Sequence, residues 1–176
     1  MQQMRILFTL FMIFLLSSCK AMIPEDYKST EPKIQIEEFF LGDIKAWGIF
    51  QARSGFVKRQ FTAKMNGAFE GENFILKEDF NWNDGKKETR QWTIKKIGEH
   101  NYEGTAPDVV GVAKGVSYGS AFKFEYNLLI PYKDKKIKVK FDDWIFKQDE
   151  KVAINRAIVT KFGFKVGELT VFFLKN

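Results

Sequence analysis

The stretch that decides the fold is Phe74–Ile94, FILKEDFNWNDGKKETRQWTI, in which two alternating apolar segments flank a turn signal. A three-residue loop that ends on Gly85 in the left-handed conformation aligns the apolar residues across this predicted hairpin. A two-residue loop would set the aromatic residues against threonine and glutamine. The favoured register therefore predicts a Glu78–Arg90 pair on the face that points to the core. The aligned pairs are Phe74 with Ile94, Leu76 with Trp92, and Glu78 with Arg90.

Alternation and turns continue along the rest of the chain after Gly42. Turn signals recur at roughly 8–14 residues, which predicts about nine or ten strands. A single sheet of that size needs its edges covered, and closure into a barrel does so. We therefore expect residues 34–176 to form one all-β domain, an antiparallel meander barrel with room inside for one small ligand. A short helical turn is expected between Lys33 and Leu41.

A second hairpin follows the same pattern around a predicted tight turn at Asp134-Lys135. That turn places an inward carboxylate, Asp143, beside the phenol of Tyr126. The predicted pairs are Ile130 with Val139, Leu128 with Phe141, and Tyr126 with Asp143. Asp142 points to the other face, together with two aromatic residues. Aromatic residues on both faces indicate a bulge, or a contact with the N-terminal segment.

Several charged residues fall on the predicted apolar faces. Burial of an unpaired charge costs several kcal/mol, so these residues must pair, reach water or bind something. Two interpretations stay open: an ion-pair network that closes one end of the barrel, or a site for the polar group of a ligand. The inward charges are Glu78, Arg90, Asp143, Arg156 and, less regularly placed, Arg59. The predicted ligand-binding residues are Trp47, Glu78, Arg90, Trp92, Tyr126, Asp143 and Arg156.

The N-terminus has the pattern of a lipoprotein signal peptide over residues 1–18. Arg5 is followed by an apolar stretch at positions 6–16 that is too short to span a bilayer. The sequence Leu16-Ser17-Ser18-Cys19 resembles a bacterial lipobox, whose cysteine receives acyl chains such as palmitate. We therefore expect residues 19–33 to form a lipidated cysteine and a tether. Lys20 favours the periplasmic face of the bacterial outer membrane as the location.

The composition argues against many enzyme classes. The chain has one cysteine and one histidine, so we predict no metal site and no cofactor. The formal net charge is +6, yet basic and aromatic residues are not interleaved as on a nucleic-acid platform, and we expect no nucleic-acid partner. Most lysines alternate with apolar residues, which indicates solvated outer strand faces. Attraction to anionic lipid headgroups is the alternative.

Several short motifs together resemble an uncharacterised family of bacterial lipoproteins, classified as a domain of unknown function. The resemblance covers nearly all of the chain after the signal. It implies a lipocalin-like β-barrel and assigns no activity. The motifs are Phe39-Phe40-Leu41-Gly42, Lys45-Ala46-Trp47-Gly48, Glu78-Asp79-Phe80, Tyr102-Glu103-Gly104-Thr105-Ala106, Phe141-Asp142-Asp143-Trp144, Asn155-Arg156-Ala157 and Lys161-Phe162-Gly163.

These observations favour a membrane-anchored lipoprotein that binds a lipid or another amphiphile inside the barrel. The alternative is a structural or partner-binding lipoprotein with a filled barrel. An enzyme that uses Glu78 and Asp143 as acid and base ranks lower, because no nucleophile stands beside a base and adjacent Asp142 points to the opposite face. An internal cavity larger than a few water molecules would favour the binding hypothesis over the filled barrel.

Overall fold

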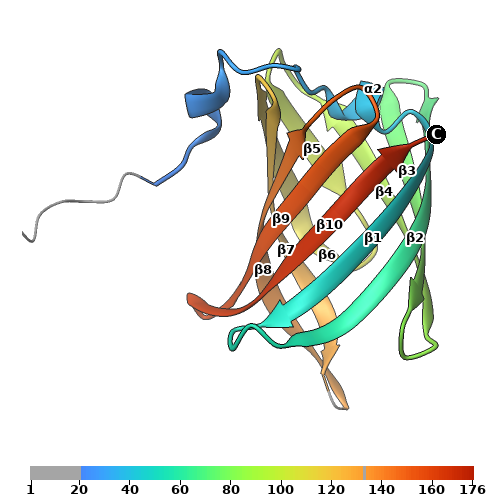
Figure 1. Ribbon diagram of the computed structural model, residues 1–176, viewed down its shortest axis with the longest axis vertical. Coiled ribbons are helices and arrows are strands. Elements are labelled where there is room, and N and C mark those ends of the chain that lie inside the picture. Colours follow the sequence, from blue (N-terminus) through green and yellow to red (C-terminus); the bar gives the residue numbers. More distant parts are fainter. Residues whose placement is uncertain (1–20, 133) are drawn as a thin grey trace, which may run out of the picture.

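The computed structural model describes residues 21–132 and 134–176, so the predicted signal peptide and Cys19 lie outside the described part. The described residues form ten antiparallel strands that close into a barrel. Each strand pairs with the next one along the chain, and the last strand pairs with the first (Figure 1). The predicted fold class, an all-β meander barrel, is confirmed. The strands are β1 (Gly42–Ala52), β2 (Val57–Glu70), β3 (Asn73–Trp82), β4 (Lys87–Lys96), β5 (Asn101–Thr105), β6 (Val109–Tyr118), β7 (Ala121–Tyr132), β8 (Lys135–Lys147), β9 (Val152–Lys161) and β10 (Phe164–Lys175).

The β3–β4 hairpin has the predicted register. Glu78 lies opposite Arg90, and Leu76 lies opposite Trp92. The backbone of Gly85 has a φ of 83°, the left-handed conformation that the three-residue loop requires. The aromatic and aliphatic side chains of this hairpin thus face the interior together with one ion pair.

The β7–β8 hairpin differs from the prediction by two residues. Tyr132 pairs with Lys135, so the connection is one residue closer to the N-terminus than the predicted turn. Tyr126 consequently lies opposite Phe141, and Asp143 lies opposite Phe124. A shift of two residues keeps every side chain on its predicted face, because side chains alternate with a period of two. Tyr126 and Asp143 are therefore diagonal neighbours inside the barrel.

Large aromatic side chains fill part of the interior by lying over small residues on neighbouring strands. A Cβ atom added to Gly48 would come within 2.2 Å of the ring of Phe61, and one added to Gly115 within 2.8 Å of Phe122. The rings of Phe122 and Phe124 have centroids 5.5 Å apart. These close approaches explain why strands with small inward residues stand next to strands with large ones.

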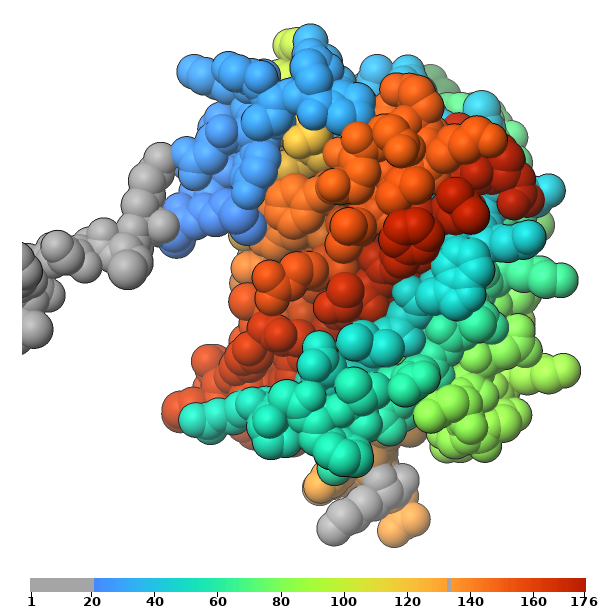
Figure 2. Space-filling model, in the orientation of Figure 1, coloured from blue at the N-terminus to red at the C-terminus, as the bar shows by residue number. Residues whose placement is uncertain are grey.

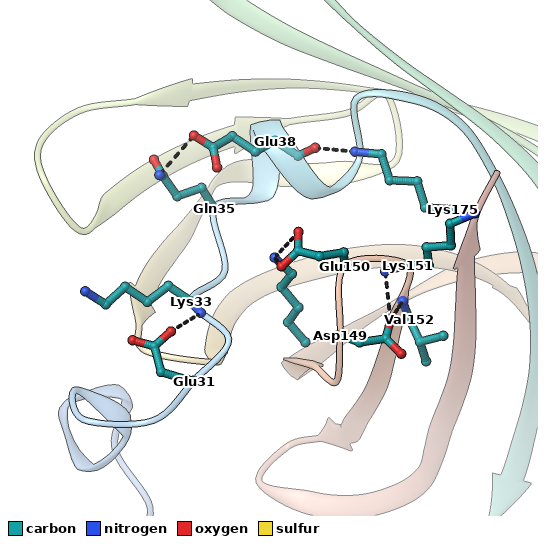
Figure 3. A network of polar contacts seen from close by, with 10 residues as sticks. Glu31, Lys33, Gln35, Glu38, Asp149, Glu150, Lys151, Val152 and Lys175 are labelled. Carbon is teal, nitrogen blue, oxygen red and sulfur yellow. Dashed lines mark hydrogen bonds and ion pairs between the residues drawn. The ribbon is translucent and has the colours of Figure 1, made fainter.

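One end of the barrel is closed by α2 (Ile36–Phe39) and the residues next to it. Ile36, Phe39 and Phe40 are buried, and the ring of Phe40 lies 5.0 Å from that of Phe173 on β10. Polar contacts fix the segment from several sides. Ser117 donates a hydrogen bond to the carbonyl of Ile34 at 2.5 Å. Figure 3 shows polar contacts at this end, including the hydrogen bond from Lys175 Nζ to the carbonyl oxygen of Glu38 at 2.7 Å.

The segment before α2 makes contacts with the outside of the barrel. It contains the 3-10 helix η1 (Pro24–Tyr27), and the ring of Tyr27 lies 5.5 Å from Phe146 and 6.0 Å from Trp144. Of the two explanations for the outward aromatic residues of β8, a bulge or a contact with the N-terminal segment, the structure shows the contact. The η1 helix, which belongs to the segment that we expected to form a tether, contacts β6 and β7. Across the described ranges, the structure contains no helix of the length and apolarity that a membrane crossing needs.

Candidate ligand cavity

The barrel encloses a cavity of about 410 Å³. Its wall extends from Ile36 and Phe40 at the closed end to Arg59, Lys86 and Pro131 at the other end. A water molecule takes about 30 Å³ of liquid volume, so the cavity has room for far more than a few waters. Aromatic and aliphatic residues together form most of the wall, and the aromatic ones are Phe40, Phe50, Phe61, Phe80, Trp82, Trp92, Phe122, Phe124, Tyr126, Phe141 and Phe173. The cavity is thus apolar, with a small number of charged groups.

Arg90 is the centre of the first charged group. Its Nη2 and Nε atoms donate hydrogen bonds to Asp108 Oδ2 at 2.9 and 3.1 Å. Its Nη1 atom is 3.8 Å from Glu78 Oε2, a long ion pair. Among the described residues, Glu78 Oε2 and Asp108 Oδ1 are buried without a hydrogen-bond partner. One arginine therefore faces two carboxylates, and each carboxylate keeps an acceptor atom free.

Asp143 is the centre of the second charged group. Tyr126 donates its hydroxyl proton to Asp143 Oδ2 at 3.0 Å, and the amide nitrogen of Asn155 donates to Asp143 Oδ1. Asn155 also donates to the carbonyl of Trp144 at 3.2 Å. Both oxygens of Asp143 are thus satisfied by neutral donors. This group needs no ligand to complete its hydrogen bonds.

Burial alters the acidity of both carboxyl groups. Loss of solvation raises the pKa of Glu78 from 4.5 to about 7, while the positive charge of Arg90 opposes this and Asp108 adds to it. Loss of solvation also raises the pKa of Asp143, to about 6, against the hydrogen bonds from Asn155 and Tyr126. The same burial raises the pKa of Tyr126 well above 10, so its phenol stays a donor. The interior is therefore a place where negative charge is costly.

The far end of the cavity carries a cation on an aromatic ring. The guanidinium carbon of Arg59 lies 3.7 Å from the ring centroid of Trp82, and its Nη2 atom pairs with Asp84 Oδ2 at 3.0 Å. Arg59 Nε and Trp82 Nε1 have no hydrogen-bond partner among the described residues. Unpaired donors thus lie toward this end of the cavity, whereas unpaired acceptors lie at Glu78 and Asp108.

Five of the seven predicted ligand-binding residues line the cavity: Glu78, Arg90, Trp92, Tyr126 and Asp143. Two were placed on the wrong face. Trp47 is 44 % exposed on the outer wall, where its ring lies 6.0 Å from that of Phe172. The side chain of Arg156 is 66 % exposed and lies 3.7 Å from Glu168. On β9 the inward Ala153, Asn155 and Ala157 are small, and the larger apolar residues of the outer face misled the assignment. On β1 the inward residues on either side of Trp47, Ala46 and Gly48, are small as well.

Asp108 and Asn155 belong to the charged groups and were missed by the sequence analysis. Asn155 is 3 % exposed, because β9 turns residues 153, 155, 157 and 159 inward. The two alanines that flank Asn155 at alternate positions, Ala153 and Ala157, were the signal for this face. Asp108 lies in the connection between β5 and β6, where alternation assigns no direction. In the sequence, an aspartate just before a stretch of valine and glycine residues indicates only a turn.

The fold is a closed, lipocalin-like β-barrel of ten antiparallel strands among the described residues. Residues 13–175 match the model of the family described as "Protein of unknown function (DUF3833)", and the chain belongs to this family. The predicted resemblance to a family of unknown function is thereby confirmed. No curated protein matches the sequence.

Two solved structures share the barrel fold. The S-type phycobiliprotein lyase CPES from Guillardia theta superposes with a TM-score of 0.61 at 8% identity, over 89% of this chain and 98% of that one. A protein of unknown function from the DUF3598 family of Nostoc punctiforme gives a TM-score of 0.57 at 11% identity, over 84% of this chain. The match spans 51% of that longer protein. At these identities the likeness concerns the fold.

Proposed function

We propose that this protein binds an amphiphile inside the barrel. The observation that carries the proposal is the cavity of about 410 Å³, which combines an aromatic wall with a few buried polar groups. This combination is typical of small-molecule sites, in which the apolar wall provides affinity and the polar groups fix orientation. A volume of this size argues against the alternative of a filled structural barrel.

An unpaired acceptor of the cavity lining defines the polar part of the ligand. Glu78 lines the cavity and its Oε2 atom is buried without a hydrogen-bond donor among the described residues, whereas Asp108, the partner of Arg90, lies outside the lining. A buried acceptor without a partner costs about 1–3 kcal/mol, and a ligand hydroxyl or amine that donates to it would recover that cost. The excess of carboxylates around Arg90 disfavours a second anion at that position. The ligand that fits has an apolar body and a hydrogen-bond donor near Glu78.

We also propose that a lipid on Cys19 anchors the barrel to the periplasmic face of the bacterial outer membrane. The support is the sequence pattern of residues 1–20 alone, because these residues lie outside the described part of the structure. Two or more acyl chains suffice for stable anchoring. A membrane-tethered barrel would have its amphiphilic ligand at hand in the adjoining bilayer.

Native mass spectrometry of the protein, extracted from membranes in mild detergent, tests the binding proposal. We expect an adduct of lipid size that Arg90→Ala loses and Arg156→Ala keeps. The two substitutions are chemically identical, but one removes an inward arginine and the other an outward one. Glu78→Gln, which preserves side-chain shape, is expected to weaken the adduct without loss of the β-sheet signal in circular dichroism. An unsubstituted protein that stays free of adducts after incubation with a total lipid extract would refute the proposal.

A further inference from the structure

The end of the barrel opposite α2 carries exposed aromatic rings on two neighbouring hairpins. Phe162 and Phe164 belong to the β9–β10 hairpin and are 88 % and 72 % exposed. Phe56 follows the β1–β2 turn and is 65 % exposed. The two hairpins are adjacent because β1 pairs with β10, and Arg53 N donates to the carbonyl of Val166 at 3.2 Å (Figure 1). We name Phe56, Phe162 and Phe164 the aromatic rim.

Phe162 is unfavourable for folding in two separate ways. Its φ of 50° and the φ of 81° at Gly163 make a two-residue turn in which both positions are left-handed. Asparagine or glycine normally occupies the first position, whereas a bulky aromatic residue rarely adopts this conformation. The same side chain leaves most of its surface in water. A residue that is unfavourable both in its backbone conformation and in its exposure to water indicates that its side chain contacts a binding partner.

Basic residues surround the aromatic rim. Lys161 Nζ lies 5.2 Å from the ring centroid of Phe162, and Lys58 Nζ lies 5.0 Å from that of Phe56. Across the same end of the barrel, turns and strand ends add further lysines and arginines. These residues are Arg53, Arg59, Lys86, Lys87, Lys135, Lys136 and Lys165. They outnumber the acidic residues Asp84, Glu88, Asp108, Asp134 and Glu168 of this end, of which Asp84 and Glu88 pair with Arg59 and Glu168 pairs with Lys165. The two hairpins with the aromatic rim project at the lower left of the molecule in Figure 2.

The opposite, closed end has an excess of carboxylates. Its turns and caps contain Glu25, Asp26, Glu31, Glu37, Glu38, Asp43, Glu70, Glu72, Glu99, Asp149 and Glu150, against the lysines Lys28, Lys33, Lys95, Lys96, Lys147, Lys151 and Lys175. The molecule is therefore electrically polar along the barrel, with the basic, aromatic end at the open side of the cavity. Amphipathic surfaces that combine basic residues with phenylalanine bind anionic bilayers through charge attraction and insertion of the rings.

We propose that the aromatic rim docks on an anionic lipid bilayer, with the phenylalanine rings inserted among the headgroups and the surrounding cations on the lipid phosphates. We choose a bilayer surface as the partner because its mobile lipid phosphates present negative charge over a flat area. Such a surface complements exposed phenylalanine side chains that are surrounded by basic residues. Docking in this orientation would set the end of the cavity lined by Arg59, Lys86 and Pro131 toward the bilayer. The inference uses the outer surface alone and does not rest on a ligand in the cavity.

The test uses the full chain with Cys19→Ser, which removes its one native thiol. An environment-sensitive fluorophore is attached through Ser54→Cys in the β1–β2 turn, or through Glu99→Cys at the closed end. Both positions are exposed. We expect the emission of the label at position 54 to shift to shorter wavelength with phosphatidylcholine vesicles that contain phosphatidylglycerol. The label at position 99 should not shift. An equal shift at both positions, or none at position 54, would overturn the proposal.

Substitutions then separate the aromatic and the electrostatic contributions. Phe162→Asn places a residue suited to the left-handed turn, so the variant should fold at least as well and still lose the shift. Ile97→Asn, at an exposed site of the closed end, is the matched control and should keep it. Arg53→Glu with Lys161→Glu should abolish the shift, whereas Lys33→Glu with Lys151→Glu should not. A shift that survives the first pair, or that occurs equally on pure phosphatidylcholine, would overturn the proposal.

Discussion

Replacement of Glu78 by glutamine tests how burial controls the interior. Burial raises the pKa of Glu78 from 4.5 to about 7. Between these pH values the native protein holds a proton that the unfolded chain has released, so the free energy of unfolding falls as the pH rises. Each pKa unit corresponds to about 1.36 kcal/mol. The carboxylate therefore costs the native state about 3 kcal/mol above pH 7 and nothing below pH 4.5.

Glutamine has the shape of glutamate and does not ionise. We expect Glu78→Gln to be more stable than the unsubstituted protein by up to about 3 kcal/mol at pH 8, and equally stable near pH 4. The attraction of Arg90 is already contained in the raised pKa of Glu78, because it opposes the effect of burial, so the ion pair needs no separate correction. Arg90 keeps its two hydrogen bonds to Asp108.

Urea denaturation followed by circular dichroism at several pH values between 4 and 8 measures this difference. Glu103→Gln is the control, since Glu103 pairs with Lys114 on the outer wall. The reasoning is refuted if the stability difference between Glu78→Gln and the unsubstituted protein does not change with pH. It is equally refuted if Glu78→Gln is the less stable protein at pH 8, because the Arg90 ion pair would then outweigh the cost of burial.

Three further substitutions probe the packing and the polar contacts. Asn155→Ala removes a donor to Asp143 and should lower the free energy of unfolding by about 1–3 kcal/mol at pH 8, and by less at pH 4, in the same urea series. Gly48→Ala places a Cβ atom within 2.2 Å of the Phe61 ring, and thermal denaturation should show a loss of about 1–3 kcal/mol. Ser117→Ala removes the hydrogen bond to the segment before α2, and amide hydrogen exchange should become faster in residues 34–40. Unchanged exchange there would show that apolar contacts alone hold the closed end.

Local sequence signals were sufficient for the fold. The alternation and the Asn-Asp-Gly turn fixed the β3–β4 register and with it the Glu78–Arg90 pair. The β7–β8 register was wrong by two residues, because several loop lengths around Lys135 preserve the same alternation and the same inward faces. The hydrophobic pattern therefore cannot detect a register error of two residues, whereas a register error of one residue would place the core side chains in solvent. The position of Asp108 was out of reach, since its partner Arg90 is 18 residues away and no strand periodicity applies to its loop.

The errors at Trp47 and Arg156 have a common cause in the way a barrel fills its interior. Alternation divides a strand into two faces but does not say which face is inside, and for Arg156 we chose the face of the larger apolar residues Val152, Ile154 and Ile158. On β1 the inward positions include Ala46 and Gly48, because the ring of Phe61 from the next strand occupies the space above Gly48. The outward Trp47 gains its contact from Phe172 on the other neighbour. The inside of a strand is thus decided by the sizes of side chains that neighbouring strands contribute, and only the assembled barrel contains that information.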